Sequence, residues 1–180
     1  SCEKDSVGLP TNYEEFLKPG TGVWSIDRLH AKTVADLQHA TPTRLLSAAD
    51  PRFLHVKDPF VYNSADGNNL LLFCSHPFSW TSSNTGYAVR RANSLTFEQP
   101  IFDFFPRGFT WDVAMTRGTC VLDVPRVGPF ADRQFSLMFY DGGECVRDHH
   151  QHTAGIHRPR GYSCEELGGV AFLVDGEFEK

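Results

Sequence analysis

Alternating hydrophobic and polar positions, separated by turn-forming residues, run along the chain from residue 53 onward and predict β-strands. Residues 56–62 are rich in β-branched and aromatic side chains, residues 63–67 have turn composition, and residues 68–75 form a second apolar run. Two such runs around a turn are typical of a β-hairpin. Further strands are predicted at 85–91, 97–105, 111–122, 134–140, 152–157 and 168–174.

The first fifty residues have weaker patterns. Residues 12–18 fit one or two helical turns that end at Pro19-Gly20. Residues 33–40 are a second short helical candidate, although the same stretch also fits a strand and a loop. The regular β pattern therefore begins only at residue 53.

The strands beyond residue 53 follow one order twice. Each half has an entry segment with an aspartate, a turn, a strand rich in Leu and Phe, a polar loop and a Gly-containing strand. The period is 54 residues if Asp58 corresponds to Asp112, and 65 if it corresponds to Asp123. Periods of this size with about four strands each indicate the blades of an all-β propeller, with approximate limits at 4–57, 58–111 and 112–180. The alternative is a meander within a β-sandwich, which needs no repeat.

Composition agrees with an all-β domain and excludes several classes of protein. Fifteen Phe, five Tyr and three Trp accompany fifteen Gly and eleven Pro, a mixture that favours short strands and turns. Hydrophobic residues make up 41% of the chain and charged residues 22%, which excludes a mostly disordered protein. The net charge of −5 provides no basic surface for nucleic acid or an anionic membrane. No apolar run approaches the ~18 residues of a membrane helix.

The five cysteines add little chemistry. Their number is odd and no C-x-x-C spacing occurs, so neither a disulfide framework nor a zinc knuckle is indicated. Cys74 and Cys120 lie within apolar runs and are expected to be small core residues. A reducing compartment is the simpler inference, which favours a cytoplasmic location.

Several short motifs resemble one known family. The Asp-Pro pair at 58–59, the Asp-Gly pair at 66–67 and the apolar run 71–75 resemble the opening of a propeller blade. Residues 86–98 are similar to a blade ending, although Ser94–Glu98 lacks the usual aspartate. Residues 111–117 and 139–142 are similar to the next blade. Over residues 42–180 the chain thus resembles the five-bladed β-propeller glycosidases of the arabinanase, xylosidase and invertase type.

The resemblance leaves the completeness of the fold open. Five blades of 54 residues need about 270 residues, whereas this chain has 180. An open propeller leaves unpaired sheet edges. Three alternatives remain: the chain is part of a longer protein, a second copy completes it, or the fold is not a propeller.

The resemblance also implies a catalytic mechanism. Glycoside hydrolysis needs two carboxyl groups, about 5–5.5 Å apart for retention or ~6.5–9.5 Å apart for inversion. In the family pattern Asp58 is the general base or nucleophile, and Asp112 adjusts the pKa of the acid and orients the sugar. The family places its acid on a later blade, which leaves room for it beyond Lys180; within this chain Glu144 is the candidate. We expect Asp58 and Asp112 to face one solvent-accessible cavity.

The alternative readings of these carboxylates are structural. An aspartate before proline often caps a turn, and Glu144 also fits a surface position. The pair Glu165-Glu166 is expected at the surface.

The candidate substrate-binding residues are Trp80, Trp111, Arg117, Asp141 and His152. Exposed aromatic rings stack on the apolar faces of sugars, and Trp80 lies in a polar loop. Arg117 fits either a site residue or a partner for a buried aspartate.

The histidines at 148–157 indicate a further alternative, a metal-dependent protein with a β-sandwich fold. No H-E-x-x-H motif occurs, however. The sequence therefore predicts a carbohydrate-directed glycosidase without metal or cofactor. A non-catalytic carbohydrate-binding propeller is the main rival, and a homo-oligomer is one way to close the sheet edges.

Overall fold

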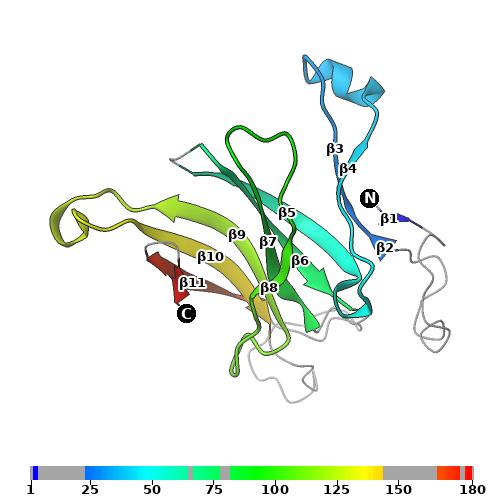
Figure 1. Ribbon diagram of the computed structural model, residues 1–180. Coiled ribbons are helices and arrows are strands. Elements are labelled where there is room, and N and C mark those ends of the chain that lie inside the picture. The colour runs from blue at the N-terminus through cyan, green and yellow to red at the C-terminus, as the bar shows by residue number, and fades with distance from the viewer. Residues whose placement is uncertain are drawn as a thin grey trace.

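The computed structural model describes residues 2–3, 23–64, 67–77, 82–143, 166–174 and 177–179. These residues form an all-β structure with no α-helix (Figure 1). The 3-10 helices that lie wholly within the described residues are η2 (Ala35–His39), η3 (Pro51–Phe53) and η5 (Gly128–Phe130). Within the described ranges, no helix has the length and apolar character that a membrane span needs.

Two four-stranded antiparallel sheets dominate the molecule, and each is a meander of consecutive strands. The first consists of β5 (His55–Asn63), β6 (Asn69–His76), β7 (Asn84–Arg90) and β8 (Ile101–Phe105). The second consists of β9 (Met115–Asp123), β10 (Phe135–Gly143), β11 (Glu166–Val174) and β12 (Glu177–Glu179). Two-stranded sheets pair β1 (Cys2–Glu3) with β2 (Val23–Trp24), and β3 (Ile26–Arg28) with β4 (Thr43–Leu46).

The predicted all-β class is confirmed, and seven of the predicted strands lie close to observed ones. The hairpin predicted at 56–62 and 68–75 is formed by β5 and β6. The helical candidate at 33–40 contains the five-residue helix η2. The predicted helix at 12–18 and the predicted strand at 152–157 lie outside the described residues. The division into blades stays a prediction. The first strands of the two sheets begin at His55 and Met115, which are 60 residues apart (115 − 55). This spacing lies between the two proposed periods of 54 and 65 residues.

The sheet of β5–β8 is buried on both faces, which explains the unbroken apolar run in β6. Successive side chains in a strand point to opposite faces. On one face Leu71 and Phe73 pack with residues of the β3–β4 region, namely Ile26, Leu46 and Ala48. On the other face Leu72 and Phe105 pack against the second sheet, through Val121, Met138, Tyr140 and Ala171. The three sheets are therefore stacked in chain order, as Figure 1 shows from blue through green to yellow.

Buried hydroxyl groups fix the position of the second sheet against the first. The Thr116 hydroxyl on β9 donates to the Phe105 carbonyl at 2.8 Å and accepts from the Thr85 backbone N–H at 3.2 Å. The Thr85 hydroxyl in turn accepts from the Gly118 N–H at 3.0 Å. Ser83 forms an isolated parallel bridge with Met115. These bonds satisfy polar groups that would otherwise be costly to bury.

The first strands of the two meanders, β5 and β9, lie beside each other and run in the same direction. Near the start of the pair Arg117 contacts Asp58, and near its end the Tyr62 hydroxyl donates to Asp123. Asp123 also accepts from the Ser136 hydroxyl at 2.7 Å. We call this boundary the β5–β9 seam.

Candidate functional site

Asp58 occupies an irregular position in β5. The register of β5 against β6 shifts between Lys57 and Phe60, so a β-bulge contains Asp58 and Pro59. Pro59 has no N–H and cannot continue the ladder, which accounts for the bulge. The φ of Asp58 is +51°, and among the described residues it is the one non-glycine residue with a positive φ. A residue before proline prefers extended backbone, so this conformation is strained and is held by its surroundings.

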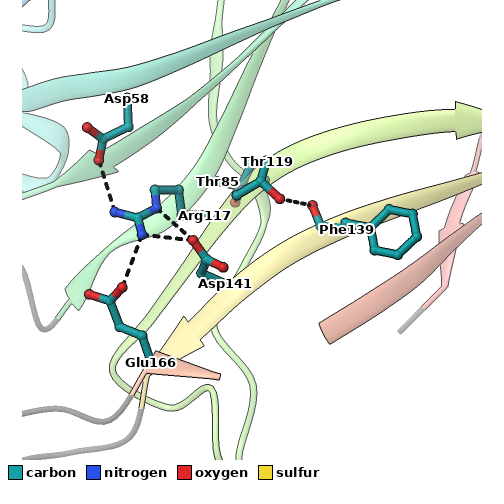
Figure 2. Close-up of polar contacts among 8 residues, drawn as sticks. Asp58, Thr85, Arg117, Thr119, Phe139, Asp141 and Glu166 are labelled. Atoms are coloured by element: carbon teal, nitrogen blue, oxygen red, sulfur yellow. Dashed lines mark hydrogen bonds and ion pairs between the residues drawn. The ribbon is translucent and has the colours of Figure 1, made fainter. Parts of the chain in front are cut away.

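The bulge directs the Asp58 carboxylate across the β5–β9 seam to Arg117. The Arg117 guanidinium contacts Asp58 Oδ2 at 3.5 Å, Asp141 Oδ2 at 2.8 Å and Glu166 Oε2 at 3.2 Å. Figure 2 shows the three carboxylates converging on the guanidinium from three different strands. We call these four residues the Arg117 cluster.

The register of the second sheet explains this convergence. Arg117 on β9 pairs directly with Asp141 on β10. Asp141 pairs with Gly168 on β11, and Glu166 lies two residues before Gly168, on the same face. Alternation therefore places all three side chains on the face of the sheet that points away from β5–β8, and the Asp58 bulge adds the fourth from the neighbouring strand.

The cluster carries an excess of negative charge. Three carboxylates surround one guanidinium, which gives a formal charge of −2. Burial alone would lower the pKa of Arg117, but its hydrogen bond to Asp141 and the charges of Glu166, Asp141 and Asp58 outweigh burial and raise that pKa. The Asp58, Asp141 and Glu166 side chains are 40%, 35% and 48% exposed, so a ligand in solvent can reach them.

The contacts with Arg117 set upper limits on the distances between the carboxylates. Asp141 and Glu166 contact the same nitrogen, so their oxygens lie within about 6 Å of each other. Asp58 contacts the neighbouring nitrogen, which places its oxygen within roughly 9 Å of the other two. These upper limits are compatible with the separations that glycoside hydrolysis uses, and the Arg117 guanidinium lies between the three carboxylates.

Asp112 does not join this cluster. It is 4% exposed, and its carboxylate accepts a hydrogen bond from the Tyr140 hydroxyl at 3.4 Å. A Cβ built on Gly142 would meet Asp112 and Trp111, so both lie on the sheet face opposite to Asp141. The expected solvent-accessible cavity shared by Asp58 and Asp112 is therefore not what the structure shows. Sequence periodicity had equated two aspartates whose strand positions differ, because Asp112 precedes β9 whereas Asp58 lies within β5.

Trp111 and Tyr140 form a packed pair with Asp112 rather than part of the Arg117 cluster. Their rings stack at 5.5 Å, and Trp111 packs against the core between the sheets. Burial, followed by the charge of Asp112 and its hydrogen bond, raises the pKa of Tyr140 to about 12. Trp111 is thus partly buried against this core, and its predicted role in stacking on a sugar stays a prediction.

The structure brings together three of the predicted site residues, Asp58, Arg117 and Asp141, and adds Glu166. The sequence predicts a surface position for Glu166, which its 48% exposed side chain bears out, but it does not predict the contact with Arg117. The signal that points to it is the alternation of Glu166, Gly168 and Val170, which aligns it with Asp141 once the register is known. The predicted residues Trp80, Glu144 and His152 lie outside the described residues.

The described part of the chain contains no group of three or more His, Cys, Asp or Glu side chains arranged to hold a metal ion. In the Arg117 cluster the guanidinium already occupies the position between the carboxylates that a cation would need.

Comparisons with protein-family models, with curated proteins and with solved structures were made on the whole chain. None of the three finds a significant match.

Proposed function

We propose that the protein binds a carbohydrate at the Arg117 cluster and hydrolyses a glycosidic bond there. The observation that carries this proposal is the position of Asp58. A strained aspartate in a bulge reaches across the β5–β9 seam to a guanidinium that holds two further carboxylates. Strained backbone persists where the surrounding structure enforces it, and functional sites are where such strain concentrates.

The geometry supports distinct roles for the three acids. Asp58 has the longest contact with Arg117, at 3.5 Å, and acts as the base or nucleophile. Glu166 has the most exposed carboxylate of the three and acts as the acid that gives a proton to the leaving oxygen. Asp141, held by two hydrogen bonds at 2.8 and 3.3 Å, positions Arg117. Glu144, outside the described residues, remains the alternative acid.

The arrangement of the sheets supports a propeller-like architecture for this site. Two meanders of four consecutive strands are stacked face to face, and their first strands run in the same direction along a common seam. In a propeller the first strand of each blade lines the central axis, so residues from successive first strands meet there. Asp58 and Arg117 meet in this way. The proposed assignment is thus to propeller blades rather than to a β-sandwich.

A panel of nitrophenyl glycosides tests the proposal. The wild-type protein is expected to hydrolyse at least one of them, and Asp58→Asn is expected to lower kcat by about 10²–10⁴-fold, because a base or nucleophile is lost. The matched control is Asp132→Asn, since Asp132 is an exposed aspartate in the β9–β10 turn. Full activity in Asp58→Asn would contradict the assigned role, and absence of hydrolysis across the panel would contradict hydrolysis itself.

One observation favours carbohydrate binding without hydrolysis as a second candidate. All three carboxylates are paired with Arg117, whereas a general acid must carry a proton. Calorimetric titration with oligosaccharides separates the two functions. Binding that is lost in Asp58→Asn, together with no turnover in the wild type, would identify a binding protein.

A further inference from the structure

A histidine side chain on β5 is hydrogen-bonded to the N-terminal strand β2. The backbone N–H of Trp24 donates to His55 Nδ1 at 3.3 Å. In the described part of the chain, β2 pairs with β1 and with no strand of the two large sheets. β2 lies at the margin of the first large sheet and packs against β5 (Figure 1). A titratable side chain thus makes a hydrogen bond between these two units.

This hydrogen bond requires the neutral form of His55. A neutral imidazole has one nitrogen that accepts and one that donates, whereas a protonated imidazole has two donors. Because Nδ1 accepts from Trp24, the neutral ring carries its proton on Nε2, and a second proton binds at Nδ1. Protonation therefore turns the acceptor into a donor that faces the N–H of Trp24, and the hydrogen bond is lost.

The surroundings of His55 favour the neutral ring. Its side chain is 6% exposed and stacks at 4.8 Å on the ring of His76, which lies directly opposite on β6. Lys57 and Cys74 form the next pair on the same face of the two strands. Burial, followed by the charge of Lys57, lowers the pKa of His55. The bond to Trp24 is therefore formed at neutral pH and is lost as the pH falls through this lowered pKa.

The strands next to β2 contribute two acidic residues. The register of β1 against β2 places Glu3 opposite Val23. Asp27 on β3 is held in an ion pair by Arg44 on β4. The charge that acts on the pKa of His55 is that of Lys57, and it opposes protonation.

β2 is short enough to open without the rest of the fold. It has two residues, of which Val23 is buried and Trp24 is 45% exposed. The chain is anchored again at Ile26, which packs with Leu46 and Leu71 in the core. Local opening of a short, partly exposed element costs less free energy than opening a core strand. An opening of β2 can therefore end before Ile26.

We propose that His55 is a pH-sensitive latch, and that its protonation releases β2, with β1, from β5 while the two large sheets stay folded. This proposal is independent of the proposed hydrolysis.

Amide hydrogen exchange, resolved by NMR at about pH 7 and about pH 4, tests the latch through protection factors, which correct for the pH dependence of intrinsic exchange. The reference is the amide of Leu71, a residue 1% exposed in the middle of β6, because it reports on global unfolding. Between the two pH values the Trp24 amide is expected to lose at least ~10-fold more protection than the Leu71 amide, since one hydrogen bond is lost.

Two variants separate His55 from the other titratable groups. In His55→Asn the Oδ1 atom is bonded to Cγ, as Nδ1 is, and accepts a hydrogen bond at every pH. Its Trp24 amide is expected to lose no more protection than its Leu71 amide. His55→Phe keeps a ring against His76 without an acceptor, so its Trp24 amide should be weakly protected at both pH values. The matched control is His30→Gln, at an exposed histidine after β3, which should behave as the wild type.

Circular dichroism at neutral pH verifies that each variant is folded. The proposal would be overturned if the wild-type Trp24 amide lost no more protection than the Leu71 amide. The same excess loss in His55→Asn as in the wild type would also overturn it, because another group would then be responsible. So would wild-type protection of Trp24 in His55→Phe at neutral pH, because the bond would then hold nothing.

Discussion

His55 and His76 face each other at the edge of β5 and β6 as a buried pair of imidazole rings. The rings stack at 4.8 Å, and the side chains are 6% and 5% exposed. His76 Nδ1 donates to the Pro77 carbonyl at 2.6 Å, which leaves Nε2 as the one buried side-chain polar atom without a partner among the described residues. Burial lowers the pKa of His76 to about 4 and also lowers the pKa of His55. Both rings are therefore neutral in the folded protein at neutral pH.

We predict that the free energy of unfolding decreases as the pH falls from about 6.5 to about 4. In this window the unfolded chain binds a proton at His76 and the folded chain does not, so stability is highest above pH 6.5. The shift of the pKa from 6.5 to about 4 corresponds to about 3 kcal/mol. Urea unfolding at pH 7 and pH 4.5 should show a smaller loss for His76→Phe than for the wild type. His39→Gln, at an exposed histidine in η2, is the control; equal losses in all three would refute the prediction.

Single residues also show where sequence reasoning reaches its limit. The Asp58-Pro59 pair was recognisable, and its candidate role came from that motif. Its contact with Arg117 depends on the bulge and on the alignment of β5 beside β9, and neither is encoded in a local pattern. Asp112 looked equivalent to Asp58 in the repeat, yet it is buried beside Tyr140 because it precedes its strand. Local motifs indicate residue types, whereas the register decides which of them meet.

At the level of elements, the pairing of Gly86 with Phe73 explains a glycine in the middle of β7. Gly86 lies directly opposite Phe73 on β6, and a Cβ added there would overlap the Phe73 ring. The aromatic ring, 1% exposed, thus covers the glycine. The strand could be predicted from its composition, but this reason for its glycine becomes visible only with the register.

We predict that Gly86→Ala destabilises the protein by about 1–3 kcal/mol, since Phe73 must leave its position in a closely packed core. Gly168→Ala on β11 is the matched control, because a Cβ at Gly168 meets no atom within 4 Å. Midpoints of urea unfolding measure both effects. A loss in Gly168→Ala as large as that in Gly86→Ala would show that strand glycines act through chain entropy and not through this contact.

The elements differ in how far the sequence predicts them. Strands β5 to β11 have apolar alternation or continuous apolar runs flanked by turn residues, and all lie near their predicted positions. β10 continues through Asp141-Gly142-Gly143, beyond the end predicted at residue 140, because these residues pair with β9 and β11. Turn composition predicts a break only when no neighbouring strand supplies hydrogen bonds.

For the whole molecule, the decisive contacts are those that join the two large sheets. The Thr116 hydroxyl is fully buried and bonds both to Thr85 and to Phe105. Such polar links across sheets come from distant residues and have no sequence signature, so a propeller and a sandwich could not be separated from the pattern alone. What the pattern does predict is the all-β class and the meander order.

We predict that Thr116→Val lowers the free energy of unfolding by about 1–3 kcal/mol, because valine has the same shape but removes both buried hydrogen bonds of the Thr116 hydroxyl. Thr119→Val is the control on the same strand. The Thr119 hydroxyl bonds to the Phe139 carbonyl at 3.1 Å at an exposed position, where water can replace it. Equal stability of the two variants, measured by urea unfolding, would show that the sheets are held by apolar packing alone.

Because β5 and β9 run in the same direction, the two ends of the β5–β9 seam hold different contacts. One end holds the Arg117 cluster, and the other holds the hydrogen bonds of Tyr62 and Ser136 to Asp123. β5 ends and β6 begins at the second end, and the connection of β9 to β10 at 124–134 also lies there. Lengthening a surface turn has a small entropic cost. Insertions and substitutions can therefore accumulate at that end of the molecule while the charged end keeps its geometry. The sequences of the two ends are free to diverge at different rates.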